Sequence, residues 1–204
     1  MVTPTQKPYT TIASWYDILD TYWEKRRYHQ ARALMWAMVK GKRILDAGVG
    51  TGRNIPFYPK TAAVDSIDLS KRMLEQAKAR AVHLKVYPHF SRMDISKLRY
   101  PSRTFDTVVS TFVLCVLTPD KEEEAVKELH RVLKKGGRLI LLDYTYSNHT
   151  LRKAIQKAFL PLIFSLYGTR LDNPTLHVVS TYFTIERVAY LHADTLRMII
   201  ARKK

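Results

Sequence analysis

The segment from Ile44 to Gly52 most constrains how this chain can fold, because a short apolar strand runs there directly into a glycine-rich turn. Glycine adopts positive φ at little cost and lets a ligand lie against the backbone. A dinucleotide fingerprint needs a third glycine where this chain has Arg53, and the pattern is Asp-x-Gly-x-Gly-x-Gly instead. Taken alone, the segment is also compatible with a plain strand-to-helix connection.

Strands and helices alternate from about residue 42 to residue 143, which predicts βαβ units and a mostly parallel sheet. Apolar strands are expected at residues 42–47, 62–68, 105–110 and 138–143. A further strand is expected at residues 86–93, and Pro88 places it at an edge of the sheet because proline lacks the N–H that a central strand needs. Residues 180–192 and 195–202 predict two strands that close the sheet as an antiparallel edge.

Two helices are expected between these strands. Ser70 can cap a helix that runs to about Ala81, and Thr118 with Pro119 begins a second helix, which the glycines at positions 136 and 137 stop.

Two regions lie outside the alternation. Residues 15–39 read as one or two amphipathic helices, and residues 149–170 as a hydrophobic insert with a basic beginning. The predicted organisation is an N-terminal helical cap at residues 1–41 and a binding domain at residues 42–204.

Length and composition predict one folded domain with an anionic partner. The chain has 204 residues, and 34 Lys and Arg against 18 Asp and Glu give a net charge of +16. A single cysteine, Cys115, is expected in the core; it excludes a disulfide framework and a Cys-rich zinc site, so no metal is expected. No stretch approaches the ~20 apolar residues of a membrane span, and the N-terminus lacks the apolar core of a signal peptide. We expect a cytoplasmic protein.

Four further motifs follow the glycine turn along the chain. Residues 66–70 read Ser-Ile-Asp-Leu-Ser, residues 92–95 read Arg-Met-Asp-Ile, and residues 105–111 and 133–139 follow at the fourth strand and before the fifth. From about Tyr16 to the C-terminus, the sequence resembles the class I S-adenosylmethionine-dependent methyltransferases. The resemblance implies a Rossmann-like α/β fold: a mostly parallel seven-stranded sheet with an antiparallel C-terminal strand, and helices on both faces. It also implies S-adenosylmethionine as the cofactor.

The resemblance assigns residues to that cofactor. The acid of the first strand and the glycines after it would hold the amino-acid end, the acid that ends the second strand would bind both ribose hydroxyls, and the segment after the third strand would read the adenine. The residues implied are Asp46, Gly48, Gly50, Gly52, Asp68, Leu69, Met73, Asp94, Ile95 and Thr111. Asp65 is a nearby alternative to Asp68, but strand alternation turns its side chain the other way.

Methyl transfer needs little acid–base chemistry, because a sulfonium donor is already activated and the acceptor has only to be positioned and shielded from water. A base is needed where the acceptor must lose a proton. The catalytic candidates, which precede the first strand or follow the fourth and fifth strands, are Tyr16, Thr111, Tyr144, Tyr146 and His149. For each tyrosine a packing role is the alternative.

Within the family, the sequence is most similar to bacterial phospholipid N-methyltransferases and quinone C-methyltransferases. The similarity lies in Trp15-Tyr16-Asp17, in the glycine turn, in the segment that ends Phe57-Tyr58-Pro59 and in the insert after the fifth strand. Residues 111–115 also resemble membrane-associated thiol methyltransferases. The resemblance implies an amphiphilic acceptor, first the amine of phosphatidylethanolamine, with a quinone precursor, a small thiol, RNA or a protein as alternatives.

The charge distribution adds an independent argument. Between Glu24 and Arg43, seven basic residues accompany a single acid, and Trp23, Tyr28 and Trp36 are interleaved with them. Such a helix suits an anionic membrane surface, and with residues 158–167 it predicts a docking face on the inner side of the membrane. A solvated helix face is the alternative. Nucleic acid is disfavoured as a partner, because the sequence carries no RNA-binding module signature.

Overall fold

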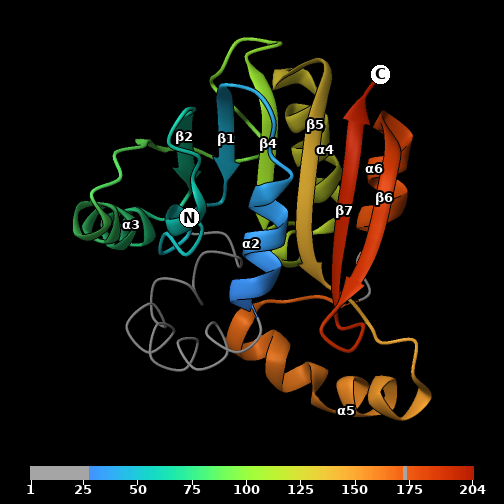
Figure 1. Cartoon of the computed structure of the whole chain (residues 1–204). Coiled ribbons are helices and arrows are strands. Elements are labelled where there is room, and N and C mark those ends of the chain that lie inside the picture. The colour runs from blue at the N-terminus through green and yellow to red at the C-terminus, as the bar shows by residue number, and fades with distance from the viewer. Residues whose placement is uncertain (1–27, 172–173) are drawn as a thin grey trace.

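The structure is a computed structural model that describes residues 28–171 and 174–204, without the side chains of residues 162–167. A seven-stranded sheet runs through it in the order β3-β2-β1-β4-β5-β7-β6 (Figure 1). The strands are β1 (Arg43–Ala47), β2 (Ala63–Asp68), β3 (His89–Arg92), β4 (Phe105–Thr111), β5 (Leu133–Tyr144), β6 (Phe183–Leu191) and β7 (Leu196–Lys203). Neighbours from β3 to β5 pair in parallel, whereas β7 is antiparallel to both β5 and β6. The predicted fold class is confirmed.

Helices cover both faces of this sheet. The helical segments are α2 (His29–Ala37), η2 (Ile55–Phe57), α3 (Lys71–Leu84), η3 (Leu114–Val116), α4 (Pro119–Val132), α5 (Thr150–Tyr167) and α6 (Thr175–Tyr182). One apolar core contains side chains of α4 and α6, and the other contains side chains of α2 and α3. On β1, Ile44 belongs to the α2 and α3 side and Leu45 to the opposite side, and both are fully buried. A parallel strand covered on both faces is buried on both, and β1 is buried from Ile44 to Ala47.

The edge position predicted for the third strand is confirmed. β3 pairs with β2 alone in the sheet order, and it begins at His89, directly after Pro88, rather than at residue 86. The proline therefore precedes the ladder and removes no hydrogen bond from it.

The expected end of the helix after Thr118 was wrong. α4 ends at Val132, and β5 begins at Leu133 without an intervening turn. The parallel pairing with β4 then skips, because Phe105 faces Leu133 while Thr107 faces Arg138. The two glycines lie inside this irregularity, where a Cβ on Gly137 would lie 2.8 Å from the carbonyl oxygen of Lys134. They permit a bulge and do not stop the helix.

The first of the two C-terminal strands was predicted to begin three residues too early. Residues 180–182 complete α6, whose Val179 is buried in the core that α4 lines, and β6 starts at Phe183. Tertiary packing thus overrides the β propensity of this run. The antiparallel closure of the sheet by β7 is confirmed.

The hydrophobic insert after the fifth strand is the helix α5, which continues through Pro161. Within residues 28–171 and 174–204, no helix is both long enough and apolar enough to cross a membrane. Of the predicted N-terminal cap, the structure describes α2; the aromatic residues at positions 15–23 lie outside the described residues.

Candidate functional site

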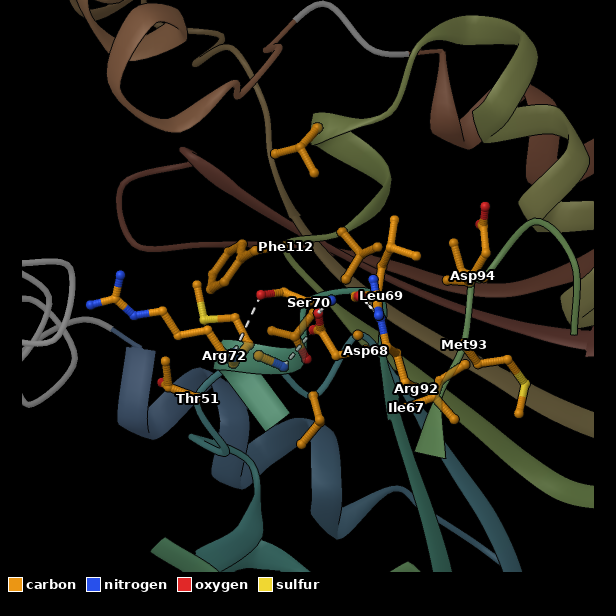
Figure 2. Close-up of a pocket in the computed structure, with 18 of the residues that line it drawn as sticks. Thr51, Ile67, Asp68, Leu69, Ser70, Arg72, Arg92, Met93, Asp94 and Phe112 are labelled. Atoms are coloured by element: carbon orange, nitrogen blue, oxygen red, sulfur yellow. Dashed lines mark hydrogen bonds between the residues drawn. The ribbon is translucent and has the colours of Figure 1, made fainter. Parts of the chain in front are cut away.

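A pocket of about 770 Å³ opens where β1, β2 and β4 end. In parallel α/β sheets this carboxyl edge is where ligands bind. Figure 2 shows Asp68 and Ser70 at the centre of the pocket, with Phe112 to one side and Asp94 to the other. Of the ten cofactor residues predicted, eight lie on its wall: Gly48, Gly50, Asp68, Leu69, Met73, Asp94, Ile95 and Thr111.

Asp68 is held at the end of β2 by backbone donors. Its Oδ2 accepts a hydrogen bond from the N–H of Gly50 at 2.9 Å, and its Oδ1 accepts one from the N–H of Ser70 at 2.8 Å. Burial raises the pKa of Asp68, and these hydrogen bonds counteract the rise. Each carboxylate oxygen keeps a second lone pair, so Asp68 can also accept from two adjacent hydroxyls.

Asp65, the rival carboxylate, lies elsewhere. Its two oxygens contact Arg43 at 3.3 Å and His89 at 3.1 Å, and it is not part of the pocket wall. The strand alternation that favoured Asp68 is therefore confirmed.

The glycine turn has one open side and one packed side. Gly50 has positive φ and lines the pocket, and a Cβ placed on it would meet nothing within 4 Å. Gly52 also has positive φ, but its Cβ would lie 2.6 Å from Cδ1 of Ile55 and 3.0 Å from Cα of Ala77 on α3. Gly52 therefore serves the contact between turn and helix and lies outside the pocket wall.

Asp46 lies behind the turn rather than on the pocket wall. Its carboxylate accepts hydrogen bonds from Nδ2 of Asn54 at 3.0 and 3.1 Å and from the hydroxyl of Tyr58. Asn54 in turn accepts from Nη1 of Arg32 at 2.7 Å. Burial raises the pKa of Asp46 to about 6, because it outweighs the hydrogen bonds from Tyr58 and Asn54 and the nearby Arg32 charge. In this structure Asp46 holds Asn54 and Tyr58, which follow the glycine turn in the sequence.

Residues 92–95, the segment that the resemblance assigned to the adenine, line the far side of the pocket. Oδ1 of Asp94 accepts hydrogen bonds from the N–H of Ser96 at 2.8 Å and from the hydroxyl of Ser96 at 2.9 Å. These bonds fix the carboxyl group in a tight turn. Ile95 and Met73 add apolar surface to the same wall. Apolar surface beside a carboxyl group suits a flat ring that carries an exocyclic donor.

Of the catalytic candidates, Thr111 lies on the pocket wall, and Tyr16 lies outside the described residues. The wall does not include Tyr144, Tyr146 or His149, which differs from the expectation. The ring of Tyr144 stacks on Phe112 with centroids 4.5 Å apart, and its hydroxyl donates to Tyr28 at 2.9 Å. Tyr146 and His149 belong to the connection that leads away into α5.

Several wall residues were missed by the sequence analysis. Arg32 of α2 is buried on the wall, and its guanidinium lies 5.4 Å from the ring centroid of Phe112. Phe112 itself adopts a left-handed φ of 57°, which is unusual for a bulky residue. Its position directly after the fourth strand was a usable signal; that of Arg32, in a helix before the first strand, was not.

The pocket fits S-adenosylmethionine on three observations. Asp68 can accept from a ribose diol, the open side of Gly50 leaves room for a ligand against the backbone, and buried Arg32 places on the wall a cation that could pair with a carboxylate. Among the described residues, no group of His, Cys, Asp and Glu is arranged to hold a metal ion.

Comparisons with known proteins identify the family of this chain. Residues 45–141 match a family described as methyltransferase domain. The chain is 35% identical over 121 residues to a phosphatidylethanolamine N-methyltransferase of Cereibacter sphaeroides, covering 58% of this chain and 59% of that one. It is 28% identical to a demethylmenaquinone methyltransferase of Tropheryma whipplei, covering 69% of this chain and 59% of that one. The chain thus spans about three fifths of the length of these relatives.

A third relative is covered more fully. It is an uncharacterized methyltransferase of Bacillus licheniformis, 30% identical over 72% of this chain and 69% of that one. Among solved structures, a SAM-dependent methyltransferase of Thermotoga maritima matches with a TM-score of 0.72 and 19% identity, over 97% of this chain and 99% of that chain. These matches indicate a methyltransferase family whose cofactor is S-adenosylmethionine, and the pocket fits that cofactor. The chain belongs to the class I S-adenosylmethionine-dependent methyltransferases.

Proposed function

We propose that this protein methylates an amphiphilic acceptor, and that the acceptor atom is the amine nitrogen of a phospholipid such as phosphatidylethanolamine. The observation that carries the proposal is the apolar wall after β4. Phe112, Val113, Val116 and Leu117 line the pocket in succession. An acceptor with an apolar part would bury it against this wall and lower the free energy of binding.

The pocket residues divide into a donor side and an acceptor side. Asp68, Gly50 and Arg32 would hold S-adenosylmethionine, which supplies an activated methyl group when it is bound. Thr111 and Phe112 stand at the exit of β4 and would face the acceptor. The Thr111 hydroxyl accepts a hydrogen bond from Asn54 at 3.1 Å, so it is held in place by the network that contains Asp46.

The reaction is balanced without a metal or a redox step. The lone pair of the amine nitrogen forms a bond to the methyl carbon, the bond from that carbon to sulfur breaks, and its electron pair stays on sulfur as a thioether. The nitrogen must first release the proton of its ammonium form, which passes to bulk water before the amine enters the pocket. Thr111 and the segment after it would orient the nitrogen and exclude water, which is the main demand of such a transfer.

A quinone precursor is the second candidate acceptor. The relative from Tropheryma whipplei, named for a demethylmenaquinone substrate, supports it. A prenylated ring is also amphiphilic, so the apolar wall alone suits both acceptors.

Label transfer separates these candidates. The protein is incubated with S-adenosylmethionine labelled in its methyl group and, in parallel, with detergent-dispersed phosphatidylethanolamine, a reduced prenylated quinone precursor, RNA and small thiols. We expect label in the phospholipid as N-methyl groups. Label confined to any other acceptor would replace the proposed substrate by that one.

A further inference from the structure

Three large apolar side chains of α5 face solvent in one stripe. Leu151 is 65% exposed, Ile155 50% and Phe159 57%. They are spaced four residues apart, so they lie above one another on a single face of the helix. Large apolar groups gathered in this way on a protein surface mark an interaction site more often than single exposed residues do.

The face of α5 next to this stripe attaches to the protein through polar groups. Gln156 donates to the carbonyl oxygen of Thr145 at 3.1 Å and accepts from the N–H of Ser147 at 2.7 Å. Arg152 donates to a carboxylate oxygen of Asp194 at 2.8 Å and to the carbonyl oxygen of Ala193 at 2.8 Å. In the first ten residues of α5, polar groups thus meet the protein, whereas a surface helix usually packs its apolar side inward.

The charge of this helix identifies the partner. The sequence of α5 contains Arg152, Lys153 and Lys157 and no acidic residue, and both lysines are exposed. At 100° per residue, both lysines lie on the side of the helix away from the stripe. An apolar face combined with lysines on the polar side is the composition of a helix that lies in the interface of an anionic bilayer. The net charge of +16 repels a second copy of this chain and attracts an anionic bilayer, so self-association is disfavoured by charge.

The position of α5 fits that partner. The helix begins six residues after β5 ends, so it lies at the edge of the sheet where the pocket opens (Figure 1). We propose that the stripe of Leu151, Ile155 and Phe159 is a docking surface for an anionic lipid bilayer, and that the long side chains of Lys153 and Lys157 reach the lipid headgroups from the polar side of the same helix. This inference rests on the proposed function for its purpose, which is to bring a membrane-embedded acceptor to the pocket.

The docking surface differs from the one that the sequence predicted. Within residues 158–167, the structure describes the exposed side chain of Phe159, whereas the side chains of residues 162–167 and the basic residues at positions 25–27 lie outside its description. The stripe defined here begins earlier in α5, at Leu151.

Vesicle co-sedimentation tests the stripe. Vesicles of phosphatidylcholine with and without phosphatidylglycerol are mixed with the wild-type protein and with the triple variant Leu151→Gln, Ile155→Gln, Phe159→Gln. We expect the wild type to sediment with the anionic vesicles and the triple variant to bind them at least about tenfold more weakly. The matched control is Val82→Gln, Leu84→Gln, Tyr87→Gln, which removes exposed apolar side chains at the end of α3 and should bind as the wild type does.

A second pair of variants separates the contribution of the lysine charges to vesicle binding from that of the apolar stripe. Lys153→Gln with Lys157→Gln should weaken binding at 0.1 M salt by about fivefold for each lysine. The difference should vanish near 1 M salt, where the Debye length falls from about 10 Å to about 3 Å. Lys78→Gln with Lys85→Gln, two exposed lysines of the α3 region, controls for the overall charge of the protein.

Three outcomes would overturn the docking surface: a wild type that stays in the supernatant with anionic vesicles, a triple variant that binds as tightly as the wild type, or a triple variant whose only change is a smaller oligomer in light scattering. Methylation of detergent-dispersed lipid distinguishes this failure from that of the proposed function. If dispersed lipid is methylated without vesicle binding, only the docking surface is wrong. If vesicles are bound and no lipid is methylated, only the acceptor is wrong.

Discussion

The carboxylate of Asp68 accepts a hydrogen bond from the backbone N–H of Gly50 at 2.9 Å, so the end of β2 is tied to the turn after β1. These residues are 18 positions apart in the sequence, and they meet because β1 and β2 are parallel neighbours in the sheet. The contact places an acceptor of hydrogen bonds beside a stretch of backbone that a ligand can approach. The cofactor assignment depends on this pair.

The two glycines Gly50 and Gly52 should respond differently to the same substitution. Gly50→Ala puts a methyl group into the open side of the turn, and we expect S-adenosylmethionine to bind at least about tenfold more weakly, with a loss of stability near 1 kcal/mol from the left-handed φ. Gly52→Ala forces a methyl group against Ile55 and Ala77, and we expect a loss of about 2–4 kcal/mol. Calorimetric titration and denaturant unfolding measure the two effects. Equal stability losses in both variants would contradict the assignment of their roles.

Asp46 should make stability depend on pH. Its pKa is about 6 in the folded protein against an ordinary value near 3.8, so between these values the folded state holds a proton that the unfolded state has released. Its contribution to stability is therefore greatest below about pH 4 and is lost as the pH rises to about 6, by up to about 3 kcal/mol.

The variant Asp46→Asn isolates this effect, because it has no carboxyl group to titrate. The free energy of unfolding of the wild type, measured relative to the variant by urea titration, should fall as the pH is raised from 4 to 7. A difference that rises with pH, or stays level, would show that folding does not raise the pKa of Asp46.

Cys115 should be inert in the folded protein. It is fully buried, and burial raises its pKa well above the ordinary value, with the nearby Asp143 carboxylate adding to the rise. The reactive thiolate is therefore scarce at neutral pH. Mass spectrometry should find no alkylation by iodoacetamide in buffer and full alkylation in guanidinium chloride. Rapid alkylation of the native protein would place the thiol in an accessible site.

The sheet and most of the cofactor wall could be predicted because they depend on local patterns. The apolar run before Asp46 forms a strand, and the acid that ends β2 lies on the pocket wall, as the sequence predicted. Alternation along a strand alone decides which face each side chain takes. Pro88 marked an edge strand for an equally local reason.

The remaining features depend on contacts between distant residues. Asp46 is drawn behind the turn by Asn54 and Tyr58, which η2 brings back toward β1. Residues 180–182 are helical because α6 packs on α4, although their side chains favour strands. The orientation of α5 results from the partners of Arg152 and Gln156, whereas the apolar periodicity of Leu151, Ile155 and Phe159 alone would place that stripe against the protein.

Calorimetric titration of S-adenosylmethionine into the wild type and into Asp68→Ala and Asp65→Ala tests the central claim most directly. The account predicts one site in the wild type and a loss of about 1–3 kcal/mol in binding free energy for Asp68→Ala, the size of a charge-assisted hydrogen-bond pair. Asp65→Ala removes a carboxylate from the same strand but outside the pocket wall, so it should bind as the wild type does. Unchanged affinity in a folded Asp68→Ala protein, or an equal loss in both variants, would contradict the assignment of Asp68 to the cofactor.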